Sequence, residues 1–503
     1  MSPILIVGAG PVGLTMAAEL ARYGLPVRLI DRSPHPAETS RALVVWSRTL
    51  ELMDRMGCAQ AFLEIGHRVH AASIRSGDAV LGRTEFSDVA SPYNFALMIP
   101  QSDTERLLAA QLRSFGVAVE RQVELVSFVA SSEGVTARLA HADGRGEVVE
   151  TPWLLGCDGA HSAVRHGLRA EFAGTAQRDD WVLADVRLDG EGRPPADEIT
   201  TYLHRDGPLA IFPMREGRVR LIAAVGEAET VHPRAAPTLA EVQSLLDQRA
   251  GHGMHASDAV WLANFRINGR KARDYRSGRV FLAGDAAHIH SPAGGQGMNT
   301  GMQDAINLAW KLAMVARGEA AASLLDSYSP ERSEVGEMVL RNATRLTDMA
   351  TLAHPAAIAA RNLVLHVMLG LHAVRQRMAL TMSEIEIAYP GSPLSSGRHA
   401  GLRLAPADYD GAPPGAGPAP RFVLHAEDTK AGAALAARFP ALLEPHPRLP
   451  PVAGRILVVR PDGYVGLSAA AKDWDEVEAY LQRLTREGAA QPVVARAEGT
   501  SSS

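Results

Sequence analysis

The chain has 503 residues, of which 46% are apolar and 21% are charged, and its formal net charge is −5. This length predicts several domains, because single cores seldom exceed about 250 to 300 residues, and the weak negative charge argues against a nucleic-acid partner. The two cysteines, Cys58 and Cys157, lack disulfide-scaffold or zinc spacing, which fits a cytoplasmic protein without a metal.

The first thirty-one residues carry the first informative pattern. Ile4 to Val7 predicts a buried strand, the run Gly8-Ala9-Gly10-Pro11-Val12-Gly13 opens a helix, and a second strand over Val27 to Ile30 ends at Asp31. In this pattern Gly8 allows the tight turn, while Gly10 lets a pyrophosphate approach the backbone and Gly13 lets helix and strand pack closely. Asp31 is placed to bind a ribose. We therefore predict a dinucleotide site, the alternative being a glycine-rich turn without a ligand.

Two arginines follow this site, and Gln101 begins a later helix. Arg41 and Arg48 are placed where a cation could meet a pyrophosphate, although either could be a solvated side chain. The alternating pattern between Val69 and Leu97 predicts antiparallel strands.

The segment from Trp153 to Arg165 is the second informative pattern. A buried strand ends at Gly156, and Asp158-Gly159 predicts a sharp turn into a short helix. Between about Phe172 and Phe265 the pattern changes to short strands of a largely antiparallel sheet. Because this region interrupts the dinucleotide fold without resembling it, we predict that it binds the substrate.

A third pattern begins with the apolar strand Val280 to Ala283. Gly284-Asp285 ends this strand, and the glycine-rich loop Ser291 to Asn299 leads into a long helix that reaches Ala313. A strand, an acid and a helix N-terminus in this order predict a second ligand-binding surface.

The remaining chain is predicted to be helical first and then mixed. Helices are expected over about Pro330 to Ala350 and Pro355 to Ser383, and a proline-rich linker over Pro413 to Pro420. The apolar run Leu363 to Leu371 is shorter than the roughly 20 residues that a membrane helix needs, so no membrane contact is expected. A small α/β domain precedes a tail, after Gln491, that is expected to be disordered.

Together, these three patterns resemble the FAD-dependent aromatic hydroxylases, in the branch of phenol and polyketide hydroxylases. The matching motifs are Gly8 to Gly13, Asp158-Gly159 and Gly284-Asp285, and the run Val280 to Asn299 is the most specific. The region from about His399 resembles the thioredoxin-like C-terminal domain of this branch. It contains no cysteine, so the resemblance implies a structural or dimer-contact role rather than thiol chemistry.

The resemblance implies an α/β fold with a Rossmann-like FAD-binding domain formed by residues 1–68, 98–172 and 266–394. An inserted antiparallel substrate domain would comprise 69–97 and 173–265, followed by a thioredoxin-like domain over 395–490 and a tail over 491–503. The residues expected to contact FAD are Gly8, Gly10, Pro11, Val12, Gly13, Asp31, Arg32, Arg41, Gln101, Leu125, Asp158, Gly284, Asp285, Pro292, Gly295, Gly297, Met298 and Asn299.

The chemistry implied by the resemblance is monooxygenation. NADPH or NADH would reduce FAD, O2 would form a flavin C4a-hydroperoxide, and one oxygen atom would enter an aromatic ring. The chain shows no second nucleotide fingerprint, so the nicotinamide is expected to bind transiently. Catalytic candidates are His204, Arg41 and Pro292, and the candidate pocket residues are Trp46, Trp181, Tyr202, His204, Phe212 and Met214. These apolar residues could instead be ordinary core, and His204 a surface histidine. His288 and His290 point the same way on an extended segment, but without a third ligand they do not predict a metal site.

Several functions remain open at this point. Epoxidation, Baeyer-Villiger insertion, antibiotic inactivation and flavin binding without turnover all fit the same fold. A halogenase is disfavoured because the six tryptophans are far apart in the sequence. The expected partner is a small aromatic molecule, with a slight preference for a polycyclic phenol, and the expected state is a monomer or homodimer.

Overall fold

The computed structural model describes residues 2–37, 42–227, 234–352 and 354–486. Arg41, a predicted catalytic and FAD-contacting residue, and the predicted tail over 491–503 therefore lie outside the described residues.

A mostly parallel sheet contains the strands of all three sequence patterns. Strand β1 (Ile4–Val7) lies between β2 (Val27–Asp31) and β12 (Leu154–Gly156), and the strand order is β18-β19-β12-β1-β2-β8. All four residues of β1 are buried, which is typical of a parallel sheet that is covered on both faces. The other strands are β8 (Val119–Arg121), β18 (Arg276–Ser277) and β19 (Val280–Leu282).

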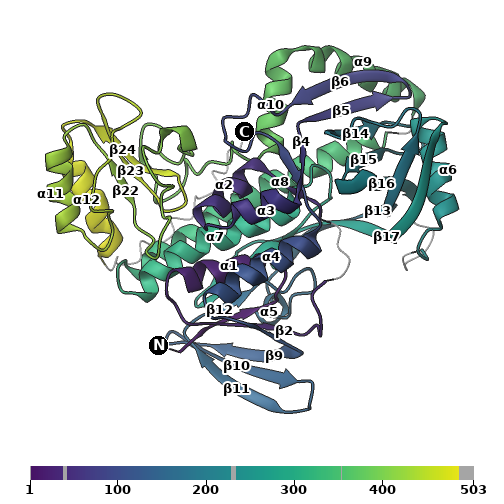
Figure 1. Ribbon diagram of the computed structural model, residues 1–503. Coiled ribbons are helices and arrows are strands. Elements are labelled where there is room, and N and C mark those ends of the chain that lie inside the picture. The colour runs from purple at the N-terminus through teal and green to yellow at the C-terminus, as the bar shows by residue number, and fades with distance from the viewer. Residues whose placement is uncertain (1, 38–41, 228–233, 353, 487–503) are drawn as a thin grey trace, which may run out of the picture.

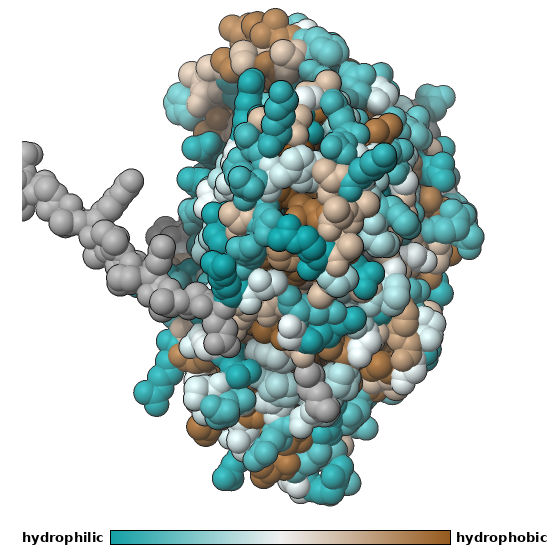
Figure 2. Space-filling model, turned by 90° about the vertical axis from the view of Figure 1, so that its left-hand side faces the viewer, coloured by the Kyte–Doolittle hydropathy of each residue, from teal (hydrophilic) through white to brown (hydrophobic). Residues whose placement is uncertain are grey.

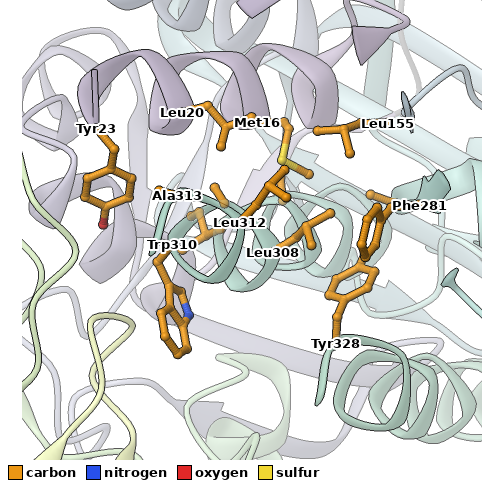
Figure 3. Close-up of a cluster of buried hydrophobic side chains, with 14 of the residues drawn as sticks. Met16, Leu20, Tyr23, Leu155, Phe281, Leu308, Trp310, Leu312, Ala313 and Tyr328 are labelled. Carbon is orange, nitrogen blue, oxygen red and sulfur yellow. The ribbon is translucent and has the colours of Figure 1, made fainter. Parts of the chain in front are cut away.

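The main core lies where helix α1 (Pro11–Arg22) packs against helix α7 (Gly297–Ala316). Figure 3 shows Met16 and Leu20 of α1 facing Leu308 and Leu312 of α7, with residues of β12 and β19 alongside. Nearly every residue of α7 is buried, as expected of a central helix that is apolar on most sides. This packing fixes the N-terminus of α7 relative to the turn that precedes α1.

Smaller elements surround this layer. Antiparallel strands β9 (Val123–Ala130), β10 (Val135–His141) and β11 (Gly146–Thr151) form a meander below the main sheet in Figure 1. A short sheet in the order β3-β7-β4 lies between the nucleotide fold and the substrate sheet. Its strands and the neighbouring helices are β3 (Val44–Val45), β4 (His67–Val69), β7 (Ala96–Met98), α2 (Ser47–Arg55), α3 (Ala59–Ile65), α4 (Gln101–Ser114) and α5 (Ala163–Gly167).

The eight-stranded sheet of the predicted substrate region, called the substrate sheet below, has the order β20-β17-β13-β16-β15-β14-β5-β6. The prediction of short strands throughout is wrong, because β13 (Phe172–Gly190) and β17 (Met254–Ala272) each extend over 19 residues and pair with each other. Register shifts near residues 176–180 and 185–187 interrupt the alternation of side chains between the two sheet faces. Each long strand therefore resembles two short ones in the sequence. The others are β5 (Ala71–Ser76), β6 (Ala79–Glu85), β14 (Glu198–Tyr202), β15 (Leu209–Pro213), β16 (Arg218–Glu227) and β20 (His288–Ile289).

Helices cover both faces of this sheet and its β6 edge. α6 (Leu239–Ala250) packs on the outer face, and α9 (Pro355–Gly370) and α10 (His372–Met382) lie over β6 after α8 (Tyr328–Ala350). The single helix expected over Pro355 to Ser383 is therefore two, bent by 94° at Leu371. Among the described residues no single helix could span a bilayer; only the bent pair α9–α10 passes by combined length and composition.

The C-terminal unit has a small sheet in the order β21-β24-β23-β22, with α11 (Thr429–Arg438) and α12 (Trp474–Thr485) beside it (Figure 1). Its strands are β21 (Ser396–Gly397), β22 (Val423–His425), β23 (Arg455–Val459) and β24 (Val465–Ala470). Arg460 contacts Glu331 of α8 through two buried hydrogen bonds of 2.7 and 2.9 Å. Burial alone would raise the pKa of Glu331, but Arg460 and Lys311 hold it far below its usual range. This ion pair joins the unit to the FAD-side helices.

Candidate active site

The turn between β1 and α1 contains three glycines, of which the first and last have no room for a side chain and the middle one does. A Cβ at Gly8 would lie 2.4 Å from the Cys157 carbonyl oxygen, and one at Gly13 would lie 1.8 Å from the Gly8 carbonyl oxygen. A Cβ at Gly10 would meet nothing within 4 Å. The N-terminus of α1 therefore faces open space at Gly10, which fits a pyrophosphate held by backbone N–H groups.

Asp31 lies at the end of β2 beside this turn. Its Oδ2 accepts the Ala9 N–H at 2.7 Å, and its Oδ1 accepts the Ser33 N–H at 2.7 Å. The carboxylate remains partly exposed, so it can stabilise the turn and still accept a hydrogen bond from a ribose hydroxyl. Arg32, the next residue, is fully exposed.

The other two motifs meet the same turn. A Cβ at Gly284 or at Gly301 would lie 2.7 Å from Cγ2 of Val12, and the Cβ at Gly8 would lie 2.7 Å from Cα of Asp158. Asp285 is the exposed residue in an otherwise buried segment and therefore faces solvent beside this junction. Three segments that are distant in the sequence thus meet at one junction.

Asp158 has a structural position at this junction. It accepts hydrogen bonds from Ser162 Oγ at 2.5 Å and from the Val164 N–H at 3.1 Å, which fixes the start of α5. Burial raises its pKa despite these bonds. Arg165 of α5 donates to the carbonyls of Ala286 and Ala160 at 2.9 and 2.7 Å, and so connects the second motif to the third.

Asp304 of α7 fixes the third motif from inside the core. Its carboxylate accepts the Gly284 N–H at 3.0 Å, His288 Nε2 at 2.7 Å and Arg332 Nε at 2.6 Å. Burial alone would raise the pKa of Asp304, but Arg332 and His288 outweigh it and keep the pKa low. His288, considered above as a metal ligand, is thus bonded to a buried acid, and its ring is stacked on that of His290 at 6.3 Å.

The loop before α7 is joined to β3. Asn299, in the first turn of α7, accepts the Trp46 N–H through Oδ1 at 2.9 Å and donates through Nδ2 to the Val44 carbonyl at 2.9 Å. Trp46 Nε1 donates to the Gly294 carbonyl at 3.0 Å, and the Gly295 N–H donates to the Pro292 carbonyl at 2.9 Å. Gly297 and Met298 remain half-buried, so the positive end of α7 is accessible beside this loop.

The remaining predicted cofactor residues have varied positions. The Gln101 N–H donates to the Ala42 carbonyl at 3.2 Å, next to the segment that contains Arg41. Leu125 is buried in the main core at the β9 strand. Arg48 does not approach the nucleotide turn, because it is buried against Glu51 and the Asp462 carbonyl of the C-terminal unit. The placement of Asp31 at the end of β2 and of Gly297 at the start of α7 suits a dinucleotide with its adenosine end at β2 and its ring end at α7.

The substrate sheet separates the predicted pocket residues into groups. Trp46, Phe212 and Met214 belong to one apolar cluster beside the α7 loop, in which the rings of Trp46 and Phe86 are 5.5 Å apart. Trp181 lies on the same sheet face as Phe212, within a neighbouring cluster around Phe265.

Tyr202 and His204 lie on the other side of the sheet. Tyr202 is buried in the cluster that α6 covers, because it shares the sheet face of Leu209 and Ala223. β14 ends at Tyr202, and His204 lies in the following loop, where its Nδ1 accepts the Asp206 N–H at 3.2 Å. Burial lowers the pKa of His204. This position favours the surface interpretation of His204 over a role as catalytic base.

Two features of this region were not anticipated from the sequence. Arg220 and Asp185 form a buried pair with two hydrogen bonds of 2.7 Å on the face that carries Phe212, and Arg220 also donates to the Ala42 carbonyl at 3.3 Å. Ala379 and Met382 of α10 complete the cluster around Trp46. Two signals in the sequence could have indicated these features. One is a charged residue within each of two apolar strands, and the other is an apolar face on a helix far along the chain.

The chain is similar in sequence and in fold to known proteins. The FAD binding domain family matches residues 1–343. Among curated proteins, the chain is 37% identical to 6-methylpretetramide 4-monooxygenase of Streptomyces rimosus, over 96% of this chain and 93% of that protein. It is 36% identical to rifampicin monooxygenase of Streptomyces venezuelae, over 71% and 74% respectively. Among solved structures, the anhydrotetracycline hydroxylase OxyS of Streptomyces rimosus superposes with a TM-score of 0.80 at 30% identity, over 97% of this chain and 100% of that chain.

Proposed function

The chain belongs to the FAD binding domain family of flavin-dependent aromatic monooxygenases, and we propose that it inserts one oxygen atom of O2 into a phenolic ring of a polycyclic, polyketide-like substrate. The packing of Val12 against both Gly284 and Gly301 is the observation that carries this proposal, because it brings the nucleotide turn and the α7 loop to one ligand.

The residues of the chain have separable tasks in this reaction. The backbone at Gly10 binds the pyrophosphate, Asp31 binds the ribose, and Asp285 binds the ribityl chain. The N-terminus of α7 stabilises negative charge on the ring system, since a helix N-terminus carries about half a positive charge. FAD, when bound and reduced by NADPH or NADH, supplies the activation of O2.

The substrate ring is proposed to lie between the α7 loop and the adjoining face of the substrate sheet. Trp46, Phe212 and Met214 provide apolar contacts there, and Trp181 lies farther along the same face. The pair Arg220–Asp185 offers polar groups to a phenol on this face. Arg41 remains a catalytic candidate from the sequence alone. Pro292 is proposed to contact the substrate through the loop that it begins.

We propose the domain boundaries that the sequence predicts, although strands of the substrate sheet extend across them. β17 crosses from the substrate region into the FAD-binding region, and β20 pairs with it from the other side. We propose that residues 395–490 form a thioredoxin-like domain. Its sequence has no cysteine, so its role is structural, and the buried bonds of Arg460 to Glu331 support that role.

The direct test is a panel of phenols and aromatic polyketides, screened for substrate-stimulated NADPH and NADH oxidation. Mass spectrometry under ¹⁸O2 then identifies the product. Gain of one labelled oxygen with an intact ring system supports hydroxylation. Nicotinamide oxidation that no aromatic compound stimulates would contradict the proposal and favour a flavin-binding protein without turnover.

A second candidate is oxidation of an antibiotic, favoured by the 36% identity to a rifampicin monooxygenase. The same screen includes rifampicin and tetracyclines to test it. A ring-expanded ester as product would indicate Baeyer-Villiger insertion instead of hydroxylation.

A further inference from the structure

Helix α9 presents its polar residues to the protein. Arg361 is buried and donates to the Met349 and Ala350 carbonyls at 3.1 and 3.4 Å, at the end of α8. Asn362 Nδ2 donates to Ser76 Oγ at 3.1 Å. Leu369 is the large apolar side chain that packs inward, against Gly82 of β6. The inner face of α9 is therefore held largely by hydrogen bonds.

The outer face of α9 is apolar instead. It carries Leu363, Val364, Val367, Met368 and Leu371, which are 65%, 57%, 57%, 43% and 53% exposed. Their spacing of three and four residues places them on one face of the helix. Figure 2 shows apolar side chains gathered at the top of the molecule, at the height where Figure 1 draws α9. Because a surface helix normally buries its apolar face, this arrangement indicates a contact surface.

The distribution of charged residues along α9 distinguishes between the partners that could cover its outer face. Residues 362–374 contain no Asp, Glu, Lys or Arg. A helix that lies on a lipid surface usually carries Lys and Arg along its polar face, whereas the one such residue of α9, Arg361, is buried against α8. Depletion of charge is typical of the core of a protein–protein interface. A two-fold axis through this face would bring no like charges together, which favours a second copy of the chain.

We propose that the outer face of α9 is the contact surface of a homodimer, in which two α9 helices pack across a two-fold axis. A stable interface buries about 800 Å² per partner. A helix of 16 residues is about 24 Å long and about 10 Å wide, so α9 supplies roughly 240 Å² at the centre of such an interface, and neighbouring surface supplies the rest.

Light scattering after size exclusion of the FAD-loaded protein tests this proposal. We expect a mass of twice the chain mass of 53.6 kDa. Val367→Glu places two carboxylates near the axis and should weaken the dimer at least tenfold. Val129→Glu is the matched control, because Val129 is 73% exposed on β9 and should leave the dimer unchanged. FAD binding should be equal in all three proteins, which separates this test from the proposed function.

Cysteine cross-linking supplies the geometric test. The native Cys58 and Cys157 are both buried, so a cysteine introduced on α9 is readily distinguished from them. Single substitutions Leu363→Cys, Val364→Cys and Val367→Cys should include at least one that forms an intermolecular disulfide, which needs Cα atoms closer than about 7 Å. Val129→Cys should form none.

Three outcomes would overturn the proposal. The wild-type protein could be monomeric at high micromolar concentration, or Val367→Glu could leave a dimer intact. Alternatively, a monomeric protein could bind phosphatidylglycerol vesicles in a way that Val367→Glu abolishes, which would identify a lipid surface as the occupant.

Discussion

Val12 and Gly284, 272 positions apart in the sequence, are in direct contact: a Cβ at position 284 would lie 2.7 Å from Cγ2 of Val12. Gly284 also has a φ of +61°, which favours glycine. The contact sets the spacing between the nucleotide turn and Asp285, and therefore the length of ligand that both can hold.

Gly284→Ala should weaken FAD binding at least tenfold, because the added methyl group separates the two motifs and a tenfold loss requires only about 1.4 kcal/mol. Fluorescence titration of the apoprotein with FAD measures the effect. Gly278→Ala is the control: its φ is +57° but its Cβ would meet nothing within 4 Å, so it reports backbone strain alone. Adding Val12→Ala to Gly284→Ala should recover much of the affinity, and no recovery would contradict this explanation.

Asp304→Asn should destabilise the protein by about 3–5 kcal/mol, because it leaves the buried Arg332 without its carboxylate. Urea unfolding of wild type and variant measures this difference. Asp326→Asn, which removes an exposed acid from its pair with the partly buried Arg276, should have a much smaller effect. Equal effects of the two substitutions would show that the Asp304 interactions are not structurally important.

Glu384 should make stability fall as pH rises. Burial raises its pKa to about 8, although Thr300 and Gln303 donate to it at 3.1 and 2.5 Å. Between an unfolded pKa of about 4.5 and the folded value, the folded state binds more protons, so stability is greatest below this range and is lost up to about pH 8. The contribution approaches about 1.4 kcal/mol per pH unit.

Glu384→Gln tests this directly, since the amide does not titrate. The difference in unfolding free energy between variant and wild type should move in favour of the variant from pH 5 to pH 8. A difference that is constant with pH would show that Glu384 is ionised throughout.

Arg460→Met should release the C-terminal unit from α8. It removes two hydrogen bonds to Glu331 and the contact with Asp462, and we expect a loss of about 3–5 kcal/mol because Glu331 keeps only Lys311 as a cationic partner. Limited proteolysis should then cleave faster between residues 390 and 421. Arg438→Met, which breaks a surface pair with Glu478, should leave the cleavage rate unchanged. Faster cleavage in both variants would point to a general effect.

The sequence was sufficient for the features that depend on local patterns. The strand–turn–helix at Gly8 to Gly13 and the strand before Gly284 follow from apolar runs and glycine positions, and the structure has them where they are expected. The helix that Gln101 is expected to begin is observed as Gln101–Ser114. Local turn chemistry and strand burial determine these elements, so one chain is enough to recognise them.

The sequence was insufficient where a residue's role depends on which face its strand presents. Tyr202 and Phe212 were both expected in the pocket, but pairing of β14 with β15 places them on opposite faces of the sheet. Arg48 was considered near the pyrophosphate, yet it contacts a segment more than 400 residues later. Register and long-range partners of this kind are set by tertiary packing, which no local pattern reports.

The measurement that tests the central claim most directly is an FAD titration of Gly10→Val. Gly10 has a φ of −77°, and a Cβ there would meet nothing within 4 Å, so the variant should fold normally by circular dichroism. The side chain would occupy the space assigned to the pyrophosphate. We predict one FAD per wild-type chain and at least hundredfold weaker binding by Gly10→Val, with Asp285→Ala weakened as well. Wild-type affinity in a folded Gly10→Val protein would contradict the claim that this turn and Asp285 bind the same FAD.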